Sequence, residues 1–150
     1  MSERSFLLFK SGGRSFACDF TDILRIEPSA GSEITFSPGF PLYMPGTVTV
    51  EGEVIPVIDG AKRFGLDPDE NRERSCFIIT YTEQGGAMSS EYKKCALLAD
   101  SIIGSIKLEE ERILPPPDLN RDSFVRYISG VFLLDGETCY IISPQKTICG

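Results

Sequence analysis

The stretch Thr47–Asp59, TVTVEGEVIPVID, holds the pattern that decides the fold. Two runs rich in β-branched residues flank Glu51-Gly52, which is typical of a hairpin with a two-residue tip. A related stretch follows at Val131–Ser143, VFLLDGETCYIIS, where Asp135-Gly136 strongly favours a type I′ turn. The chain therefore contains this hairpin twice.

The two copies match position by position at a constant spacing. Their shared skeleton is Y-x-x-G-x-x-x-x-[ED]-G-E-x-x-x-x-I, and ACDFTDI and ALLADSI match more weakly upstream. The matched positions are Tyr43 with Tyr127, Gly46 with Gly130, Gly52 with Gly136, Glu53 with Glu137 and Ile58 with Ile142. We expect one all-β unit of roughly five strands used twice within a single domain, residues 1–150. The first unit covers about 14–66, with exchanged strands allowed, and the second about 76–148.

Other elements follow from turn signals. FLLFK, SGGR and SFACDF predict a hairpin, and in TDILRIEP either Thr21 or Asp22 is able to cap a helical turn that stops at Pro28. DGAKRFGLDPDENRERS predicts a short helix or turn and then a polar connector, and EQGGAMSSEYKK a long polar loop. Pro115–Pro117 predicts an extended polyproline segment.

Composition excludes several functions. The net charge of -7 and the lack of a basic stripe argue against nucleic acid and anionic membranes as partners. The absence of histidine excludes histidine triads, histidine metal sites and phosphorelay on this chain. Five widely spaced cysteines form no C-x-x-C pair, so we expect no metal and no cofactor, with buried inert thiols in the strands and an exposed Cys149.

An enzyme using Asp59 or Asp100 stays an alternative. Both residues end a predicted strand, where a turn or capping carboxylate is the simpler interpretation. No phosphate-binding glycine loop occurs. The longest apolar run, CALLA, is too short to cross a membrane, and MSERS leads into too few apolar residues for a signal peptide, so we expect a cytoplasmic protein.

Two motifs in the order found here resemble the CheW-like domain family. They are GTVTVEGEVIPVID at Gly46–Asp59 and ALLADSIIG at Ala96–Gly104, with ILPPPDL and the last hairpin after them. The resemblance spans about Phe6 to Ile148. It implies two five-stranded SH3-like barrels packed across an apolar seam, with short helical turns. It also implies a non-catalytic adaptor that couples the cytoplasmic tips of methyl-accepting chemoreceptors to the histidine kinase CheA, at receptor arrays on the inner membrane.

The resemblance also suggests where the partners bind. A receptor helix would lie in a groove between the barrels, and the regulatory domain of the kinase would bind an edge of the first barrel. The groove residues are Ile23, Arg25, Ile26, Glu51, Leu98, Ile102 and Ile103. The kinase-binding residues are Tyr43, Met44, Val48, Val50 and Val54. Barrel core is the alternative role for each of these apolar side chains.

One departure from the family pattern falls at the tip of the first hairpin. Such domains usually carry Arg before the tip glycine and an acid after the second strand, whereas this chain has Glu51 and Arg25 at those places. We expect these two side chains to form the usual ion pair with reversed polarity. The alternative is that they are two independent surface residues. The alternatives to the chemotaxis adaptor are a family member serving a non-chemotactic signalling array and, more remotely, a small β-barrel that binds peptides.

Overall fold

The computed structural model describes residues 2–28, 34–36, 38–66, 76–83, 92–116 and 123–149. Strands dominate, and the helices are single turns or little more. The strands are β1 (Glu3–Ser11), β2 (Arg14–Asp19), β3 (Ile23–Pro28), β4 (Thr35–Phe36), β5 (Gly46–Val50), β6 (Glu53–Asp59), β7 (Cys76–Glu83), β8 (Tyr92–Ala99), β9 (Ser101–Glu109), β10 (Ile128–Leu134) and β11 (Glu137–Ile142). The helical turns are η1 (Phe20–Asp22), α1 (Gly60–Arg63), η3 (Glu110–Arg112), η4 (Ser123–Tyr127) and α2 (Pro144–Cys149).

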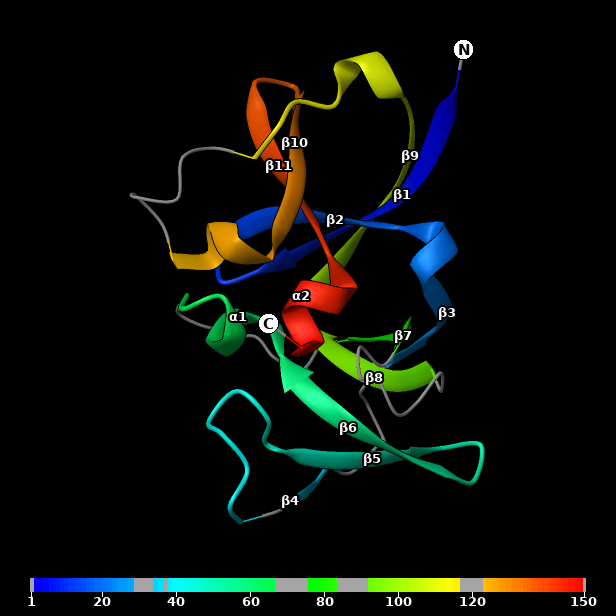
Figure 1. Cartoon of the computed structure of the whole chain (residues 1–150), viewed down its shortest axis with the longest axis vertical. Helices are drawn as coiled ribbons and strands as arrows, with labels where there is room; N and C mark the ends of the chain where they lie inside the picture. Colours follow the sequence, from blue (N-terminus) through cyan, green and yellow to red (C-terminus); the bar gives the residue numbers. More distant parts are fainter. Residues whose placement is uncertain are drawn as a thin grey trace.

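The strands form two sheets, each curled into a small barrel. Barrel A has the strand order β10-β11-β2-β1-β9, and barrel B has the order β3-β7-β8-β6-β5-β4. Figure 1 shows barrel A above barrel B, with α2 between them. The predicted all-β fold class is confirmed, and barrel B gains the two-residue strand β4 beyond the five strands expected.

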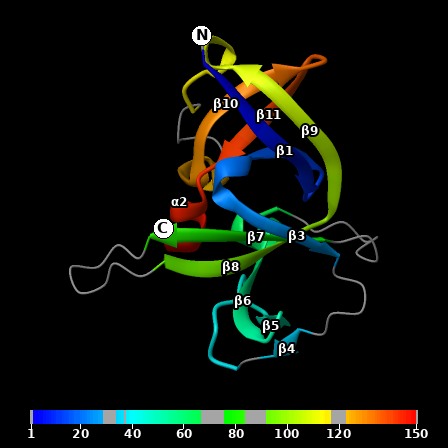
Figure 2. The ribbon, with the colours of Figure 1, turned by 90° about the vertical axis from the view of Figure 1, so that its right-hand side faces the viewer.

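Each barrel takes strands from both halves of the chain. After β2 the chain crosses to barrel B through η1, and after β8 it crosses back to barrel A at Asp100, as the colours in Figure 2 show. Each repeated hairpin then joins the opposite half through a parallel pairing, β11 with β2 and β6 with β8. Residues 14–66 and 76–148 therefore each contribute to both barrels. The sequence repeats therefore do not coincide with the barrels, because each repeat contributes strands to both of them.

The repeated hairpins have the same tips and the same anchors. Both central residues have positive φ at Glu51-Gly52 (50° and 80°) and at Asp135-Gly136 (52° and 80°), which is the signature of the type I′ turn. The amide of Asp59 donates to the carbonyl of Tyr43, and the amide of Ser143 donates to that of Tyr127, both at 2.8 Å. The matched tyrosines therefore lie shortly before the first strand of each hairpin, and their carbonyls accept an amide at or just beyond the end of the second strand.

Three apolar clusters hold the barrels together. One fills barrel A around Phe6 and Phe132, and one fills barrel B around Phe77 and Ile79. The third forms the seam between the barrels, where Phe16 stacks on Phe64 with ring centroids 4.7 Å apart. A residual cavity of about 10 Å³ at the seam has room for a single water at most. Among the described residues the seam is therefore a packed core.

Several local predictions change. The helical turn is the 3₁₀ turn η1, capped by Asp19 instead of Thr21 or Asp22, and Ile23–Pro28 is a strand. The helix α2 was not predicted, although Ser143 and Pro144 are a capping residue and a favoured first helical residue. The polar connector beyond Leu66, most of the EQGGAMSSEYKK loop, Pro117 and the side chain of Cys149 lie outside the described residues. No helix among the described residues is long and apolar enough to span a bilayer.

Candidate functional site

Strand β3 presents two kinds of apolar side chain. Ile23 is half-buried against the seam cluster, while Leu24 and Ile26 are exposed, at 46% and 40% of their surface. The alternation along β3 leaves every second residue in contact with solvent. Of the predicted groove residues on this strand, Ile26 is thus the one most open to a partner.

The second half of the predicted groove comes from β8 and β9. Leu98 is 8% exposed and packs inside barrel B, so it is part of the barrel core. Ile102 is half-buried against the seam cluster, as Ile23 is, and Ile103 is 51% exposed. Figure 2 shows β3 and β9 on the same face of the molecule. The structure therefore leaves Ile26 and Ile103 as the exposed apolar groups of that set.

Arg25 and Glu51 form the predicted ion pair. The distance from Arg25 Nη1 to Glu51 Oε1 is 2.6 Å, and Arg25 Nη2 also pairs with Glu27 on the same strand. The contact with Glu51, with the nearby charge of Glu27, raises the pKa of Arg25, and the same contact lowers the pKa of Glu51. Both terminal nitrogens of the guanidinium are turned toward acids, whereas Arg25 Nε is buried and has no hydrogen-bond partner among the described residues.

The predicted kinase-binding residues divide by depth. Tyr43 and Met44 are half-buried against the seam, Val50 is half-buried at the rim of barrel B, and Val48 is 2% exposed inside it. Val54 is 65% exposed and lies opposite Thr49 on the outer face of the β5–β6 hairpin. Val54 is therefore the member of this set that a partner could contact most directly.

Sequence reasoning missed further exposed apolar side chains on and beside β4. Phe36 on β4 is 75% exposed and Leu42 is 88% exposed, with Phe40 also exposed between them. Their stretch reads as an ordinary proline-rich loop in the sequence, so only the prolines signalled its conformation. Large apolar groups exposed this close in the chain indicate a contact surface more often than chance.

The residues considered for chemistry have structural roles. Asp59 caps α1 by accepting from the Lys62 amide at 3.3 Å, and Asp100 accepts from the Gly12 amide at 2.8 Å, which confirms the capping interpretation. Burial raises the pKa of the Cys18, Cys76 and Cys139 thiols, so they are poor nucleophiles. The described residues contain no group of metal-ligating side chains.

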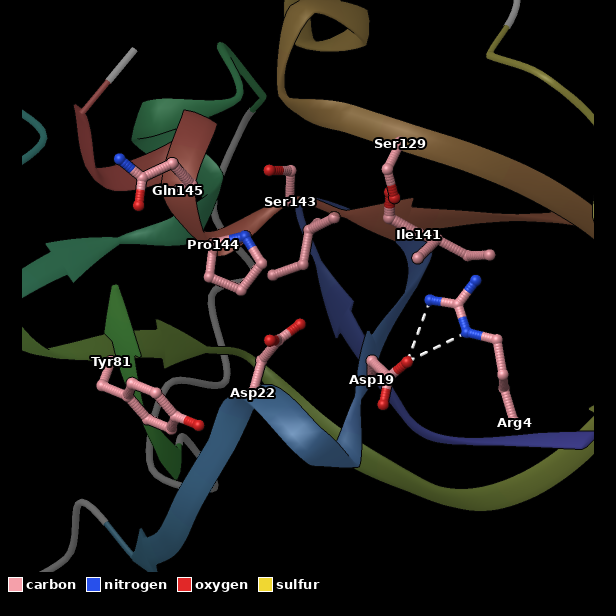
Figure 3. Close-up of a pocket in the computed structure, with 10 residues that line it drawn as sticks. Arg4, Asp19, Asp22, Tyr81, Ser129, Ile141, Ser143, Pro144 and Gln145 are labelled. Carbon is pink, nitrogen blue, oxygen red and sulfur yellow. Dashed lines mark hydrogen bonds and ion pairs between the residues drawn. The ribbon is translucent and has the colours of Figure 1, made fainter. Parts of the chain in front are cut away.

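A polar pocket of about 350 Å³ opens where the two barrels meet beside η1 (Figure 3). Arg4 on β1 donates from Nε and Nη2 to Asp19 Oδ2 at 3.0 and 2.9 Å. Burial alone would raise the pKa of Asp19, but hydrogen bonds from Thr21 and Arg4 outweigh it and hold that pKa below its ordinary value. Burial, with the nearby charge of Asp19, raises the pKa of Asp22.

These features describe a binding protein made of two strand-sharing β-barrels. Residues 5–149 match the CheW-like domain, and the chain therefore belongs to the CheW-like domain family. The chain is 25% identical over 143 residues to a probable chemotaxis protein CheW of Rhizobium etli, covering 95% of this chain and 86% of that protein. It is 24% identical over 150 residues to the chemotaxis protein CheW of Thermotoga maritima, covering 99% and 89%.

The fold has a solved counterpart. The crystal structure of the scaffolding protein TtCheW from Thermoanaerobacter tengcongensis superposes with a TM-score of 0.79 at 25% identity, covering 95% of this chain and 90% of that one. The chain is thus a CheW-like scaffold of the chemotaxis type, from a non-catalytic family. This confirms the predicted family and fold class and the prediction that the chain is not an enzyme.

Proposed function

We propose that this chain is an adaptor that couples the cytoplasmic tips of chemoreceptors to the regulatory domain of a CheA-type histidine kinase. It works in the cytoplasm, within receptor arrays at the inner membrane. The relatives named chemotaxis protein CheW and the match over residues 5–149 support this role. The observation that carries it is the presence of exposed apolar side chains on β3, β9 and the β5–β6 hairpin of otherwise well-packed barrels.

The first surface, the β3/β9 surface, consists of Leu24, Ile26 and Ile103. These side chains are 40–51% exposed and lie on strands that follow the two crossovers between the barrels. An amphipathic helix buries a stripe of apolar residues in such a surface. The β3/β9 surface is therefore proposed to bind the helical hairpin of the receptor tip, with Ile23 and Ile102 supporting it from beneath and Leu98 in the core of barrel B.

The second surface, the hairpin surface, is the outer face of the β5–β6 hairpin, where Val54 is exposed opposite Thr49. Phe36 and Leu42 are also exposed on and beside β4, but the register of Phe36 with Gly46, and of Gly46 with Val57, puts Phe36 on the other face of the sheet. The outer face of the β5–β6 hairpin carries two neighbouring cross-strand pairs, Thr47 with Pro56 and Thr49 with Val54. None of these four residues is charged. Uncharged, partly apolar faces of this kind suit burial against another folded domain. The hairpin surface is proposed to bind the kinase regulatory domain, with Tyr43, Met44, Val48 and Val50 fixing the shape of the hairpin.

A family member serving a non-chemotactic array is the second candidate. The Arg25–Glu51 pair favours this second candidate, because its polarity is opposite to the usual family pattern. Reversed charges beside the β3/β9 surface would suit receptors with a different charge pattern. Charge reversal tests this candidate. Glu51→Arg should weaken binding of the native receptor tip, and adding Arg25→Glu should restore it. Unchanged binding in the single variant would remove the role of the pair in partner choice.

Calorimetric titration with the receptor tip and the kinase regulatory domain of the same organism tests the adaptor role. Ile103→Glu should weaken receptor binding by at least about tenfold and leave kinase binding intact, and Val54→Glu should do the reverse. Leu133→Glu is the matched control, because Leu133 is 55% exposed on β10 outside both surfaces. If the parent protein binds neither partner, the adaptor function fails.

A further inference from the structure

The proposed function leaves the pocket beside η1 unused. Its wall is built from both barrels: Arg4 and Asp19 come from β1 and β2, Asp22 from η1 and Tyr81 from β7. The opposite side is the end of β11 and the start of α2. Figure 3 shows Asp22 pointing from η1 toward the β11–α2 junction, on the side of the pocket away from Arg4.

The two acids in the pocket differ in how their charge is satisfied. Asp19 accepts two hydrogen bonds from Arg4 and two from Thr21, all between 2.9 and 3.0 Å. Asp22 has no hydrogen bond or ion pair with any described residue and is half-buried. Partial burial of a carboxylate without a hydrogen-bond partner costs free energy, so ionised Asp22 lowers the stability of the folded chain.

The other polar groups in the pocket complement a donor. Ser129 and Ser143 line the pocket with hydroxyl oxygens that are able to accept a further hydrogen bond, although the Ser129 hydroxyl already donates to the Ile141 carbonyl and Ser143 Oγ accepts from the Lys146 amide. The cation on the wall, Arg4, is already held by Asp19 through two of its nitrogens. The charge of Arg4 also reaches Asp22, but no hydrogen bond joins the two residues. An anion would therefore meet the charge of Asp22, whereas a cationic N–H donor finds a carboxylate without a hydrogen-bond partner and the two serine hydroxyls.

The size and the apolar part of the pocket limit the ligand further. A volume of about 350 Å³ lies at the lower end of the range for small-molecule pockets, so it suits one side chain better than a large ligand. Ile141, Ile142 and Pro144 supply an apolar wall beside the acceptors. The methylene stem of a long basic side chain packs on such a wall while its head group reaches an acid.

We propose that this pocket binds one lysine or arginine side chain of a partner protein, with its charged head at Asp22 and its stem against Ile141, Ile142 and Pro144. The net charge of -7 on the chain favours the approach of a basic partner. This inference goes beyond the proposed function and does not depend on the assignment of the β3/β9 surface or the hairpin surface to particular partners.

The test uses small probes that carry only the proposed head and stem. n-Butylammonium and n-butylguanidinium are titrated into the ¹⁵N-labelled full chain and followed by two-dimensional amide NMR, with n-butylurea as the neutral control of the same shape. The two cations should shift the amides of Asp19, Asp22, Ser143 and Gln145 in a saturable way. Asp22→Asn should weaken this binding at least about tenfold, because it removes the charge that the head group pairs with.

Asp135→Asn is the matched control variant, since it makes the same chemical change at the tip of the β10–β11 hairpin, away from the pocket. Asp22→Asn should fold as well as the parent at neutral pH, because Asp22 holds no structural partner. The proposal is overturned if butylurea shifts the same amides with equal affinity, if Asp22→Asn binds the cations as the parent does, or if the pocket amides do not shift.

Discussion

The two repeated hairpins share one turn geometry but differ in the residue that adopts it. Glu51 and Asp135 both have φ near 50°, a left-handed conformation that aspartate tolerates better than glutamate. Asp135 therefore suits the turn itself. Glu51 does not, and it reaches Arg25 across the mouth of barrel B, where no equivalent pair is found among the described residues of barrel A. The two hairpins thus share one turn conformation, and the contact with Arg25, outside the turn, accounts for glutamate at position 51.

The largest expected contrast lies inside the barrels. Phe132 and Val48 hold matched positions of the two hairpins, at 1% and 2% exposure, but Phe132 fills barrel A beside Phe6 with ring centroids 6.0 Å apart. Phe132→Ala should cost about 3–5 kcal/mol of unfolding free energy and Val48→Ala roughly 2 kcal/mol. Urea denaturation measures both. Equal losses would show that the two cores contribute alike.

The matched glycines should come next. A Cβ at Gly46 would lie 1.9 Å from the Thr35 carbonyl oxygen, and one at Gly130 would lie 2.9 Å from Ile113 Cγ2. Gly46→Ala meets backbone and Gly130→Ala meets a side chain that is able to move, so both should lose about 1–3 kcal/mol, Gly46→Ala the more. Thermal unfolding ranks them, and a harmless Gly46→Ala would mean that β4 leaves the sheet without consequence.

The acids of the pocket should differ in their response to pH. The pKa of Asp19 is held below its ordinary value of about 4, so its stabilising contribution is present above that pH and disappears as the pH falls through the lower folded value. Asp19→Asn should therefore lower stability at pH 7 and flatten the acid limb of the stability curve. The pKa of Asp22 is raised, so its ionised form at neutral pH lowers the free energy of unfolding instead of raising it. Asp22→Asn should therefore not lower stability at pH 7. Denaturation midpoints between pH 2 and 7 give both curves.

The smallest contrast lies at the hairpin tips. Asp135→Gly should change stability little, and Asp135→Ala should lose up to roughly 1 kcal/mol, since alanine fits the left-handed region poorly. At the other tip, both Glu51→Ala and Glu51→Gly remove the ion pair with Arg25. Alanine still pays the free energy of a positive φ at this position, whereas glycine does not. Glu51→Gly should therefore be the more stable of the two. The reverse order of midpoints would contradict the turn assignment.

The sequence could predict much of the local structure, because hairpins leave short-range signals. The tips, the repeated glycines and the Arg25–Glu51 pair followed from the aligned skeleton and the family pattern. The parallel pairings of β2 with β11 and β6 with β8 could not be predicted, since alternation along a strand does not name its neighbour. The same limit applies to depth: Val48 and Val54 look alike in sequence, yet one is inside the barrel and the other outside.

The pocket depended on tertiary structure in the same way. The sequence pattern predicts Asp22 only as a possible helix cap. In the structure Asp19 caps the 3₁₀ turn instead, because it immediately precedes that turn. Nothing in the local pattern brings η1 beside Tyr81 and the start of α2. Only the folded chain places those groups around one space.

The sharing of strands also has a consequence for the speed and order of folding. Barrel A needs β1 to meet β9 and β2 to meet β11, contacts that join the first and last parts of the chain. Such distant contacts slow the folding of small domains, because a long loop must close before they form. During synthesis neither barrel is able to close from the first half alone. Until β11 leaves the ribosome, the β1–β2 hairpin keeps an open edge that a chaperone or a neighbouring chain is able to occupy.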